Sequence, residues 1–561
     1  MKKPRHQARL IFVAVFFVLI LSTLIWRMID LTILDRQFLM GQGDARSLRV
    51  VSLPAYRGMI IDRESAPIAV STPVQSVWIN PKTFTANKAQ LAELAKLLGI
   101  STAQLSTRVK KSGNREFVYL QRQLPPMLAK NIEALKIPGL NFQEEFKRYY
   151  PEGDSVAQLI GFTNVDDNGI EGLELAYQQW LMGVSGKKRV VKDRLGRVIE
   201  ELGITKEPRP GNVLQLSIDR RIQFFAYHEL KNTVEKFGAK SGSVIVLDTE
   251  NGEVLAVANY PSFNPNARFR YTLDSYRNKA LTDVFEPGSV IKPFTIASAL
   301  ESGQFTPATV IDTRPSWMVV HGRMIRDIHN YGVLDVVGVL QRSSNVGVSK
   351  MALASPPEQL IGLLTRAGIG QRTESGYPGE SEGSIVKVAD ANPFVLATLS
   401  FGYGMSVSAL QLAKSYLIFA NQGKLLPISL LHNQPIGESK QVLNPDTANQ
   451  VLSMLEAVVS GADGTGKAAQ VPGYRVAGKT GTARIAGKKG YEEKRYISSF
   501  VGIAPVSKPR LIVAVVIHEP THAGYYAATV AAPLFAKVMG STLRILDIPP
   551  DQQTRATNET H

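Results

Sequence analysis

The apolar residues near the start of the chain form one unbroken run. Leu10 to Trp26 reads LIFVAVFFVLILSTLIW without a charge, and a helix of this length just crosses the hydrocarbon core of a membrane. The basic residues before the run favour the cytoplasmic side, so the remaining chain is expected outside. A cleaved signal peptide is the alternative. No small-x-small site closes the run, which favours an uncleaved anchor over 10–30 after a cytoplasmic tail over 1–9.

From Ser243 onwards the hydrophobic pattern is that of strands and helices. Ser243–Asp248 and Glu253–Ala258 are apolar runs on either side of Asn251-Gly252, the strongest short-range signal for a hairpin. Three further strand-like runs come late: Tyr474–Ala477, Tyr496–Ala504 and Leu511–Ile517. A helical pattern follows over Ala527–Leu546, with apolar residues that can lie on a sheet. Together these runs predict one antiparallel sheet, flanked by helices and assembled from distant parts of the chain.

The region between the anchor and Asp219 is less regular, with short strands and helices interrupted by Gly and Pro. Pro208–Gly211 is the most natural seam between two folded units, and a helix is predicted to open at Ile218. The fold class expected is α+β. Its predicted parts are a mixed domain over 45–215, a sheet domain over 216–548 and a flexible tail over 549–561.

Composition removes several kinds of function. The chain has 561 residues, 44% of them hydrophobic, and no cysteine, so thiolate catalysis, iron–sulfur clusters and disulfides are excluded. The net charge is +16, but the basic residues form no single stripe and no nucleic-acid motif accompanies them. We therefore predict no nucleic-acid partner. A basic protein beside anionic lipid and an acidic wall polymer is favoured.

Ser289 and Lys292 are the first candidate catalytic pair. Pro287-Gly288 precedes an apolar stretch, which suggests a turn that feeds a helix at Ser289. Residues three apart on a helix share a face, so Lys292 would lie within reach of the serine hydroxyl as its base. A lysine serves as a base only if burial or a second cation lowers its pKa. Alone the pattern is weak, because Ser185–Lys188 repeats it in a polar stretch that we interpret as a solvated loop.

Two further motifs follow in order. Ser343-Ser344-Asn345 provides a Ser-x-Asn pattern, although Ser112-Gly113-Asn114 matches it too. Lys479-Thr480-Gly481-Thr482 occurs once and closes the predicted strand Tyr474–Ala477. Ser-x-x-Lys, Ser-x-Asn and Lys-Thr-Gly in this order resemble the set found in penicillin-binding proteins and serine β-lactamases. The ordered set, rather than any single motif, identifies Ser289 as the candidate nucleophile.

Physical chemistry suggests a role for each member of the last motif. Lys479 is the expected second cation, which would depress the pKa of Lys292 and attract a terminal carboxylate of the substrate. Thr480 and Thr482 offer hydroxyl groups to that carboxylate. Gly481 would let the substrate backbone approach the strand edge closely.

The remaining members would handle the proton and the oxyanion. Ser343 can relay a proton to the leaving amine, and Asn345 can hold both the substrate amide and the lysine. The N–H of Ser289 and the strand edge around Thr482 can form an oxyanion hole.

Other chemistry is disfavoured. His518-Glu519-Pro520-Thr521-His522 spells a zinc-protease signature, but that motif works only on a helix. Here it follows a predicted strand and contains a proline that a helix interior does not accept. His321 and His329 are interpreted as structural. No metal and no cofactor are predicted.

At this point the chain is similar to class B penicillin-binding proteins, and to their FtsI type. The motifs that carry the resemblance are, in order, Arg57–Arg63, Gly169–Glu174, Arg277–Ala280, Val284–Ser289, Ser343–Gly347, Phe401–Gly404, Lys479–Thr482 and Ala531–Phe535. The resemblance implies a non-catalytic pedestal over 45–215 and a transpeptidase domain over 216–548. It departs from the family at Val290, where Thr is frequent, and after residue 517, where Asp-Pro is expected.

The resemblance also implies a reaction and partners. Ser289 would attack the D-Ala–D-Ala bond of a peptidoglycan stem peptide, release D-alanine and pass the acyl group to an amine on a neighbouring stem. β-Lactams would acylate the same serine. A single-pass inner-membrane protein, with its catalytic domain in the periplasm at the division septum, would work with an FtsW-type glycosyltransferase and with FtsQ, FtsL, FtsB and FtsN.

Several alternatives remain open. An elongation-type transpeptidase is the first, although Ser343-Ser344-Asn345 is the form that resembles the septal rather than the elongation-type enzyme. A β-lactamase or carboxypeptidase needs water to attack the acyl-enzyme, and no Glu-x-x-Leu-Asn lies between Ser343 and Lys479. A β-lactam sensor or scaffold without turnover is the third. A sensor should carry a cytoplasmic output domain, but only nine residues precede the anchor.

Overall fold

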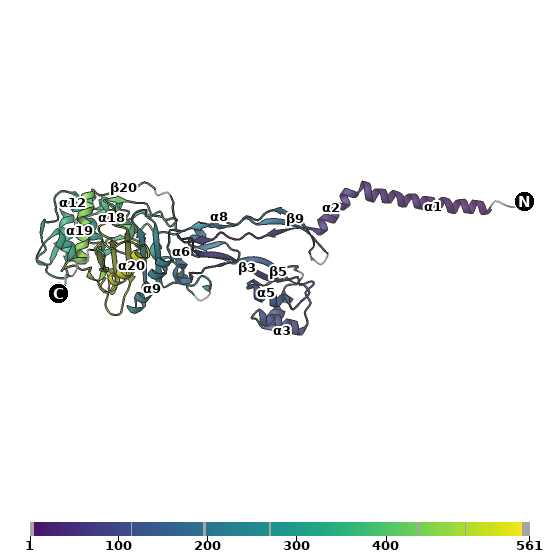
Figure 1. Cartoon of the computed structure of the whole chain (residues 1–561), viewed down its shortest axis with the longest axis horizontal. Helices are drawn as coiled ribbons and strands as arrows, with labels where there is room; N and C mark the ends of the chain where they lie inside the picture. The colour runs from purple at the N-terminus through teal and green to yellow at the C-terminus, as the bar shows by residue number, and fades with distance from the viewer. Residues whose placement is uncertain are drawn as a thin grey trace, which may run out of the picture. The chain divides into compact units, whose positions relative to one another are not determined.

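The chain folds into two compact units (Figure 1). The computed structural model describes residues 5–113, 115–193, 198–268, 271–434, 437–487 and 490–552. The first unit comprises Met1–Arg57, Pro73–Phe146 and Gly183–Gly211, and the second comprises Gly58–Thr72, Lys147–Met182 and Asn212–His561. The last passage between the units follows Gly211, at the end of the predicted seam. Two segments inside the range predicted for the first domain, 58–72 and 147–182, belong to the second unit.

The N-terminal apolar run is a helix, as predicted. Helix α1 (Arg5–Ile29) continues through a π-helical turn, Asp30–Leu34, to α2 (Arg36–Ser47). The stretch His6–Leu34 is long and apolar enough to cross a membrane, and its apolar window is entirely unburied. Residues 1–4, which include two of the basic residues before the apolar run, lie outside the described residues. So do residues 553–561 of the predicted tail.

Two sheets shape the membrane-proximal half of the sequence. Strands β1 (Leu48–Leu53), β8 (Gly186–Lys192) and β9 (Val198–Lys206) form an antiparallel sheet in the order β1-β8-β9. Strands β3 (Pro67–Ile79), β4 (Val118–Leu124) and β5 (Leu140–Tyr149) belong to a second sheet. Part of it buries an apolar core with α3 (Lys88–Leu97), α4 (Thr102–Lys111) and α5 (Pro126–Glu133).

The expectation of a solvated loop at Ser185–Lys188 is wrong. Strand β8 begins at Gly186 and pairs with β1 on one side and β9 on the other. Backbone pairing on both edges overrides the polar character of these side chains, because a strand needs only one compatible face. In the second Ser-x-Asn match, Ser112–Asn114, Ser112 is the C-cap of α4, and Asn114 lies outside the described residues.

The second unit is built on the predicted antiparallel sheet. Its order is β12-β11-β23-β22-β21, and the strands are β11 (Ser241–Asp248), β12 (Val254–Tyr260), β21 (Ala477–Gly487), β22 (Gly490–Ala504) and β23 (Leu511–His518). The β11–β12 pair is the hairpin predicted around Asn251-Gly252. Val244 of β11 lies opposite Val515 of β23, so strands far apart in the sequence are neighbours, as predicted.

The predicted strand Tyr474–Ala477 is wrong in position. Strand β21 begins only at Ala477, and Lys479 therefore lies inside the strand, opposite Val501 of β22, rather than beyond its end. The residues Lys-Thr-Gly carry little strand signal of their own, and pairing with β22 supplies the extended conformation.

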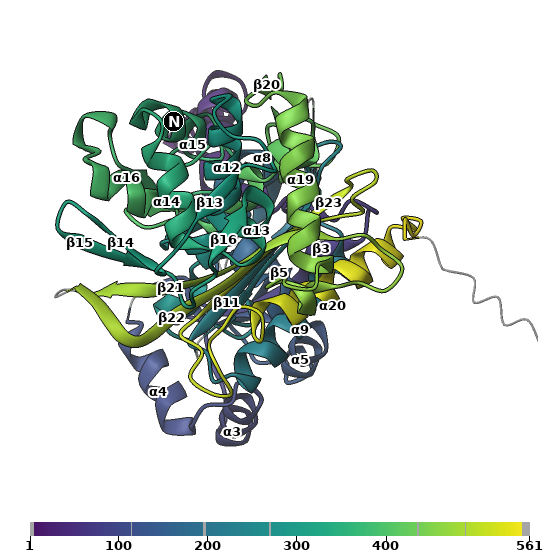
Figure 2. The ribbon, with the colours of Figure 1, turned by 90° about the vertical axis from the view of Figure 1, so that its left-hand side faces the viewer.

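Both faces of this sheet are buried, and the alternation of β11 shows how. Val244 and Val246 join a core with helices α9 (Arg220–Lys236) and α20 (Ala531–Ile545), whereas Ile245 and Leu247 join the core on the opposite face. Figure 2 shows α9 and α20 on one side of the sheet and α12 (Lys292–Glu301) and α14 (Asn345–Leu353) on the other. Ring centroids of Phe500 and Phe535 lie 4.6 Å apart between β22 and α20, so the late helix packs on the sheet as predicted.

The remaining strands and α-helices complete this unit. They are β2 (Ile60–Ile61), α6 (Ala157–Ile160), β6 (Phe162–Thr163), β7 (Gly169–Glu171), α7 (Gly172–Ala176), α8 (Gln178–Leu181), β10 (Leu214–Gln215), α10 (Leu273–Tyr276), α11 (Lys279–Thr282), β13 (Val310–Asp312), β14 (Trp317–Val320), β15 (Arg323–Arg326), β16 (Val333–Asp335), α13 (Val336–Gln341), α15 (Pro357–Arg366), β17 (Ser384–Ile385), α16 (Pro393–Leu399), β18 (Met405–Ser406), α17 (Ala409–Ser415), α18 (Leu417–Ala420), β19 (Lys424–Leu425), β20 (Lys440–Gln441) and α19 (Pro445–Ser460).

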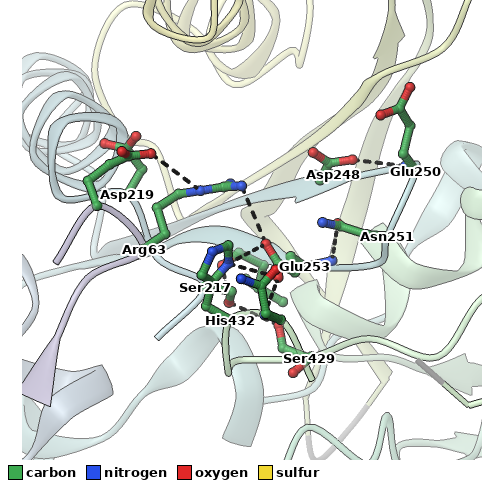
Figure 3. A network of polar contacts seen from close by, with 12 residues as sticks. Arg63, Ser217, Asp219, Asp248, Glu250, Asn251, Glu253, Ser429 and His432 are labelled. Atoms are coloured by element: carbon green, nitrogen blue, oxygen red, sulfur yellow. Dashed lines mark hydrogen bonds and ion pairs between the residues drawn. The ribbon is translucent and has the colours of Figure 1, made fainter. Parts of the chain in front are cut away.

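A buried polar network ties distant segments together at the turn between β11 and β12 (Figure 3). The Glu253 carboxylate accepts the N–H of Asn433 at 2.9 Å and lies 3.0 Å from Nδ1 of His432. Its second oxygen lies 3.5 Å from the guanidinium of Arg63. Since the Glu253 side chain is only 5% exposed, these partners satisfy a charge that burial would otherwise make costly. The network holds the early segment 58–72 in the second unit.

Candidate active site

Ser289 and Lys292 share one turn of helix. A 3₁₀ turn, Gly288–Ile291, leads directly into α12 at Lys292. Side chains three residues apart eclipse in a 3₁₀ turn, so Lys292 follows Ser289 on the same face, as predicted. Gly402 permits this turn, because a Cβ on it would lie 2.1 Å from the Gly288 carbonyl oxygen.

The Lys292 ammonium is bound by the Ser-x-Asn segment. Its Nζ donates to the carbonyl oxygen of Ser343 at 2.5 Å, to Ser343 Oγ at 3.0 Å and to Asn345 Oδ1 at 2.8 Å. Lys292 is fully buried, and Ser289 is half-buried. Within the part of the chain that the structure describes, the Ser289 hydroxyl has no hydrogen-bond partner. The structure thus brings two of the predicted residues, Ser343 and Asn345, to the lysine.

Lys479 is the predicted second cation. It is fully buried, and burial lowers its pKa to about 7. The pKa of Lys292 is lowered well below its usual range by burial first and by the charge of Lys479 second. A buried lysine beside another cation loses its proton more easily, so Lys292 is suited to act as a base.

The edge of the sheet carries the rest of the last motif. Strand β21 is the final strand in the sheet order, so one of its edges faces away from β22. A Cβ on Gly481 would lie 2.5 Å from Ser499 Oγ and 2.9 Å from a methyl of Val290. Glycine here therefore lets β21 pack against the turn that holds Ser289. Thr480 Oγ1 lies 3.1 Å from Thr465 Oγ1, and Thr482 Oγ1 accepts the N–H of Ala527 at 3.1 Å.

A group of tyrosines next to Thr482 was not predicted. The rings of Tyr496 and Tyr525 stack with centroids 3.9 Å apart, and Tyr526 stacks on Tyr525 at 4.5 Å. Tyr403 Oη accepts the N–H of Arg484 on β21 at 3.2 Å. Tyr403, Tyr496 and the adjacent pair Tyr525 and Tyr526 come from three separate segments, and no spacing in the sequence relates these segments. Tyr526 is 48% exposed, so the stack offers ring surface near the catalytic strand.

Asp327 is a second feature of the site that the sequence motifs did not predict. It follows β15 and accepts hydrogen bonds from the first backbone N–H groups of α14, at Asn345 and Val346. The hydroxyl of Ser344 also donates to it, at 2.5 Å. It is one of many aspartates in the sequence, and only the fold brings it to the Ser-x-Asn segment.

The zinc-protease signature is not on a helix, as predicted. His518 ends strand β23, and His522 lies in the loop after it. The Glu519 carboxylate between them forms ion pairs with Arg495 at 2.6 Å and Lys240 at 3.3 Å. Burial lowers the pKa of His518 to about 4, and its ring meets Phe285 edge-on. Among the described residues no cluster of histidines and carboxylates could hold a metal ion.

The two other histidines lie on the hairpin side of the site. His321 is in the turn between β14 and β15, and His329 follows Asp327 with its ring 6.1 Å from that of Tyr331. Among the described residues, neither histidine is hydrogen-bonded to Lys292 or Lys479, so the structure gives no sign of a histidine-based triad there.

Comparison with known proteins decides the family. Residues 242–540 match the model for the penicillin binding protein transpeptidase domain, and residues 52–216 match that for the penicillin-binding protein dimerisation domain. The chain belongs to the class B penicillin-binding proteins. Its relatives include the peptidoglycan D,D-transpeptidase FtsI of Escherichia coli, 42% identical over 96% of this chain and 91% of that protein.

Two further likenesses agree with this assignment. The probable peptidoglycan D,D-transpeptidase PbpC of Pseudomonas aeruginosa is 42% identical over 98% of this chain and 97% of its own length. The crystal structure of penicillin-binding protein 3 from Mycobacterium tuberculosis, complexed with aztreonam, matches with a TM-score of 0.70 at 26% identity. It covers 90% of this chain and 98% of that one. The resemblance inferred from the motifs is confirmed.

Proposed function

We propose that this penicillin-binding protein is a peptidoglycan D,D-transpeptidase whose nucleophile is Ser289. The observation that carries the proposal is the surroundings of Lys292: a buried lysine of depressed pKa, three residues from a serine and hydrogen-bonded by Ser343 and Asn345. A base of this kind activates a serine hydroxyl. Relatives over nearly the whole chain carry the name peptidoglycan D,D-transpeptidase.

In the proposed reaction, neutral Lys292 takes the proton of Ser289 as Oγ attacks the carbonyl carbon of the penultimate D-alanine of a donor stem. The oxyanion is stabilised by the backbone N–H groups of Ser289 and Thr482. Ser343 passes the proton to the leaving nitrogen, the C–N bond breaks and D-alanine departs. An amine of a second stem then attacks the ester carbonyl and forms the cross-link, and the ester C–O bond to Ser289 breaks. A proton from that amine passes to Ser289 Oγ and restores its hydroxyl group.

The terminal carboxylate of the donor is proposed to bind beside Lys479. With a pKa of about 7, this lysine gains its proton readily when an anion approaches, since an opposite charge favours the charged form. Thr480 and Thr482 would add hydroxyl hydrogen bonds. Asn345 would hold the substrate amide, and Gly481 would leave room for its backbone at the edge of β21.

The cellular setting is part of the same proposal. The helix α1 would anchor the chain in the inner membrane, with the basic N-terminus in the cytoplasm and the catalytic unit in the periplasm. The likeness to FtsI supports work at the division septum, with an FtsW-type glycosyltransferase and FtsQ, FtsL, FtsB and FtsN as partners. An elongation role is the second candidate, and depletion followed by microscopy separates them: septation fails in the first case and rod shape in the second.

The proposal is tested by incubation with benzylpenicillin, followed over hours by intact mass, with Ser289→Ala as the control. A single long-lived adduct on the natural chain and none on the variant is expected. Rapid loss of the adduct with consumption of drug would instead indicate a β-lactamase. No adduct on the natural chain would refute the catalytic role of Ser289. An adduct without cross-linking of stem peptides in the presence of partners would favour a sensor.

A further inference from the structure

Asp327 accepts hydrogen bonds at the start of helix α14 with both carboxylate oxygens. Its Oδ1 accepts the N–H of Asn345 at 2.5 Å and of Val346 at 3.1 Å, and its Oδ2 accepts the hydroxyl hydrogen of Ser344 at 2.5 Å. The first N–H groups of a helix have no partner within the helix. A carboxylate placed there satisfies them and interacts favourably with the helix dipole.

Helix α14 already has an ordinary cap. Ser344 is its N-cap, and the Ser344 hydroxyl oxygen accepts the N–H of Gly347 at 2.9 Å. One such cap is what most helices use. Asp327 takes up the two N–H groups that Ser344 leaves and also orients the Ser344 hydroxyl. This second cap comes from another element of the fold, because Asp327 directly follows β15.

The end of β15 also orients the Asn345 side chain. The carbonyl oxygen of Arg326 accepts from Nδ2 of Asn345 at 2.9 Å. An amide whose nitrogen is bound in this way must turn its oxygen in the opposite direction, and Oδ1 accepts from Lys292 at 2.8 Å. Arg326 and Asp327 together therefore fix both the backbone and the side chain of Asn345.

Ser343, the residue before the segment that Asp327 binds, has a strained backbone. Its φ is +58°, in the left-handed region that a residue with a Cβ rarely adopts. Such a conformation persists only where the surroundings hold it. In this conformation Ser343 presents both its carbonyl oxygen and its hydroxyl to Lys292. The hydrogen bonds of Asp327 to the three residues after Ser343 fix that segment and so maintain both contacts.

Charge gives Asp327 a second effect on the lysine. Burial and the charge of Lys479 lower the pKa of Lys292, whereas the charge of Asp327 raises it. Two buried cations with no opposing charge would be costly. Asp327 sits where one negative charge offsets part of that cost.

We propose that Asp327 is a positioning residue of the transpeptidase: it holds Ser343 and Asn345 against Lys292 and keeps one negative charge near that buried lysine. The inference rests on the proposed function, in which neutral Lys292 is the base that activates Ser289. A residue that only caps a helix would affect stability and leave the ionisation of the base unchanged.

The experiment measures the second-order rate of acylation by benzylpenicillin from pH 5 to 9, with melting temperature as the stability readout. Asp327→Asn keeps an acceptor oxygen for the helix but loses the charge. Because that charge raises the pKa of Lys292, its removal moves the midpoint of the rising acid limb to lower pH, by about half a unit or more. Asp327→Ala shows the same shift and a plateau rate about 10- to 100-fold lower, since Ser343 and Asn345 are released.

The control is Asp219→Asn. Asp219 is the buried N-cap of α9, on the other face of the sheet, and accepts the N–H of Arg221 at 2.9 Å. This variant should lower the melting temperature and leave the midpoint in place. An equal loss of stability in both Asn variants, with no shift of the midpoint in either, would overturn the proposal and leave Asp327 as a cap. Failure of the natural chain to form any adduct would refute the proposed function itself, and the inference with it.

Discussion

Two buried polar clusters in the second unit handle charge in opposite ways. Around Glu253, a carboxylate is surrounded by donors, among them Arg63 and the backbone of Asn433. Around Lys292, a cation is buried within the field of a second cation, Lys479, and one carboxylate, Asp327, opposes the effect of Lys479 on the pKa of Lys292. The first cluster pairs opposite charges. The second brings like charges together.

The difference separates a cluster that holds the fold from one suited to chemistry. Pairing opposite charges satisfies groups that burial would otherwise make costly. Crowding two lysines raises the free energy of their charged forms, so that one of them becomes a base near neutral pH. Both clusters join segments distant in sequence, so long-range assembly alone does not mark an active site.

The sharpest test of this comparison exchanges one cation in each cluster for methionine. Lys292→Met should lower the rate of acylation by penicillin about 1,000-fold, because the serine loses its base. Its melting temperature should not fall, since a desolvated cation has been removed. Arg63→Met should do the reverse, with a lower melting temperature and acylation within about twofold of the natural chain. A loss of acylation in both variants would show that the clusters are not separable.

Next in size is the loss of the carboxylate in the paired cluster. Glu253→Ala should cost about 3 kcal/mol of stability, since Arg63 and His432 lose the partner that satisfies them in a buried place. Chemical denaturation of the full chain measures it, and acylation of the folded fraction should be unchanged. A cost below about 1 kcal/mol would mean that water replaces the carboxylate as it does at a surface.

A smaller effect distinguishes the like-charge cluster by pH. The pKa of Lys479 is about 7 in the folded chain against 10.5 for a free lysine. Between these values the unfolded chain binds more protons, so this group adds stability as pH rises and loses that contribution as pH falls towards 7. The slope is at most about 1.4 kcal/mol per pH unit. Melting temperatures from pH 7 to 9 should therefore rise less steeply in Lys479→Met than in the natural chain; parallel curves would contradict the depressed pKa.

The smallest effect belongs to an ion pair that burial does not reinforce. Lys537 on α20 lies 2.7 Å from Glu229 on α9, as close as many buried contacts, but its side chain is 61% exposed. Lys537→Met should change stability by less than about 1 kcal/mol, because solvent screens the pair. A change as large as that in Glu253→Ala would show that distance rather than burial decides the strength of these contacts.

Much of the fold could be predicted because local signals agreed with long-range pairing. Asn251-Gly252 between two apolar runs specifies a hairpin wherever it occurs, and the run Leu511–Ile517 is long and apolar enough to be a central strand. The strand predicted over Tyr474–Ala477 was misplaced, because pairing with β22 decides where β21 begins and ends, and its own residues do not. Strand pairing of this kind is invisible in a single sequence.

The residues of the proposed catalytic set could be singled out because they lie in short motifs. Ser289 and Lys292 are three residues apart, and that spacing survives any uncertainty about the rest of the fold. Asp327 and the stacked tyrosines carry no such spacing. Their contact with the site depends on where the β14–β15 hairpin and the loop after β23 end, which tertiary packing decides.

The order of strands in the sheet has a consequence for how the protein is made. Strand β21, which carries Lys479, reaches the early strand β11 only through β22 and β23. A growing chain that has just passed Gly487 thus contains every predicted catalytic residue and still has no closed sheet to hold them. Activity has to wait until the strand Leu511–His518 has been synthesised, and a product truncated before it would expose the unpaired edge of β11 to proteases and aggregation.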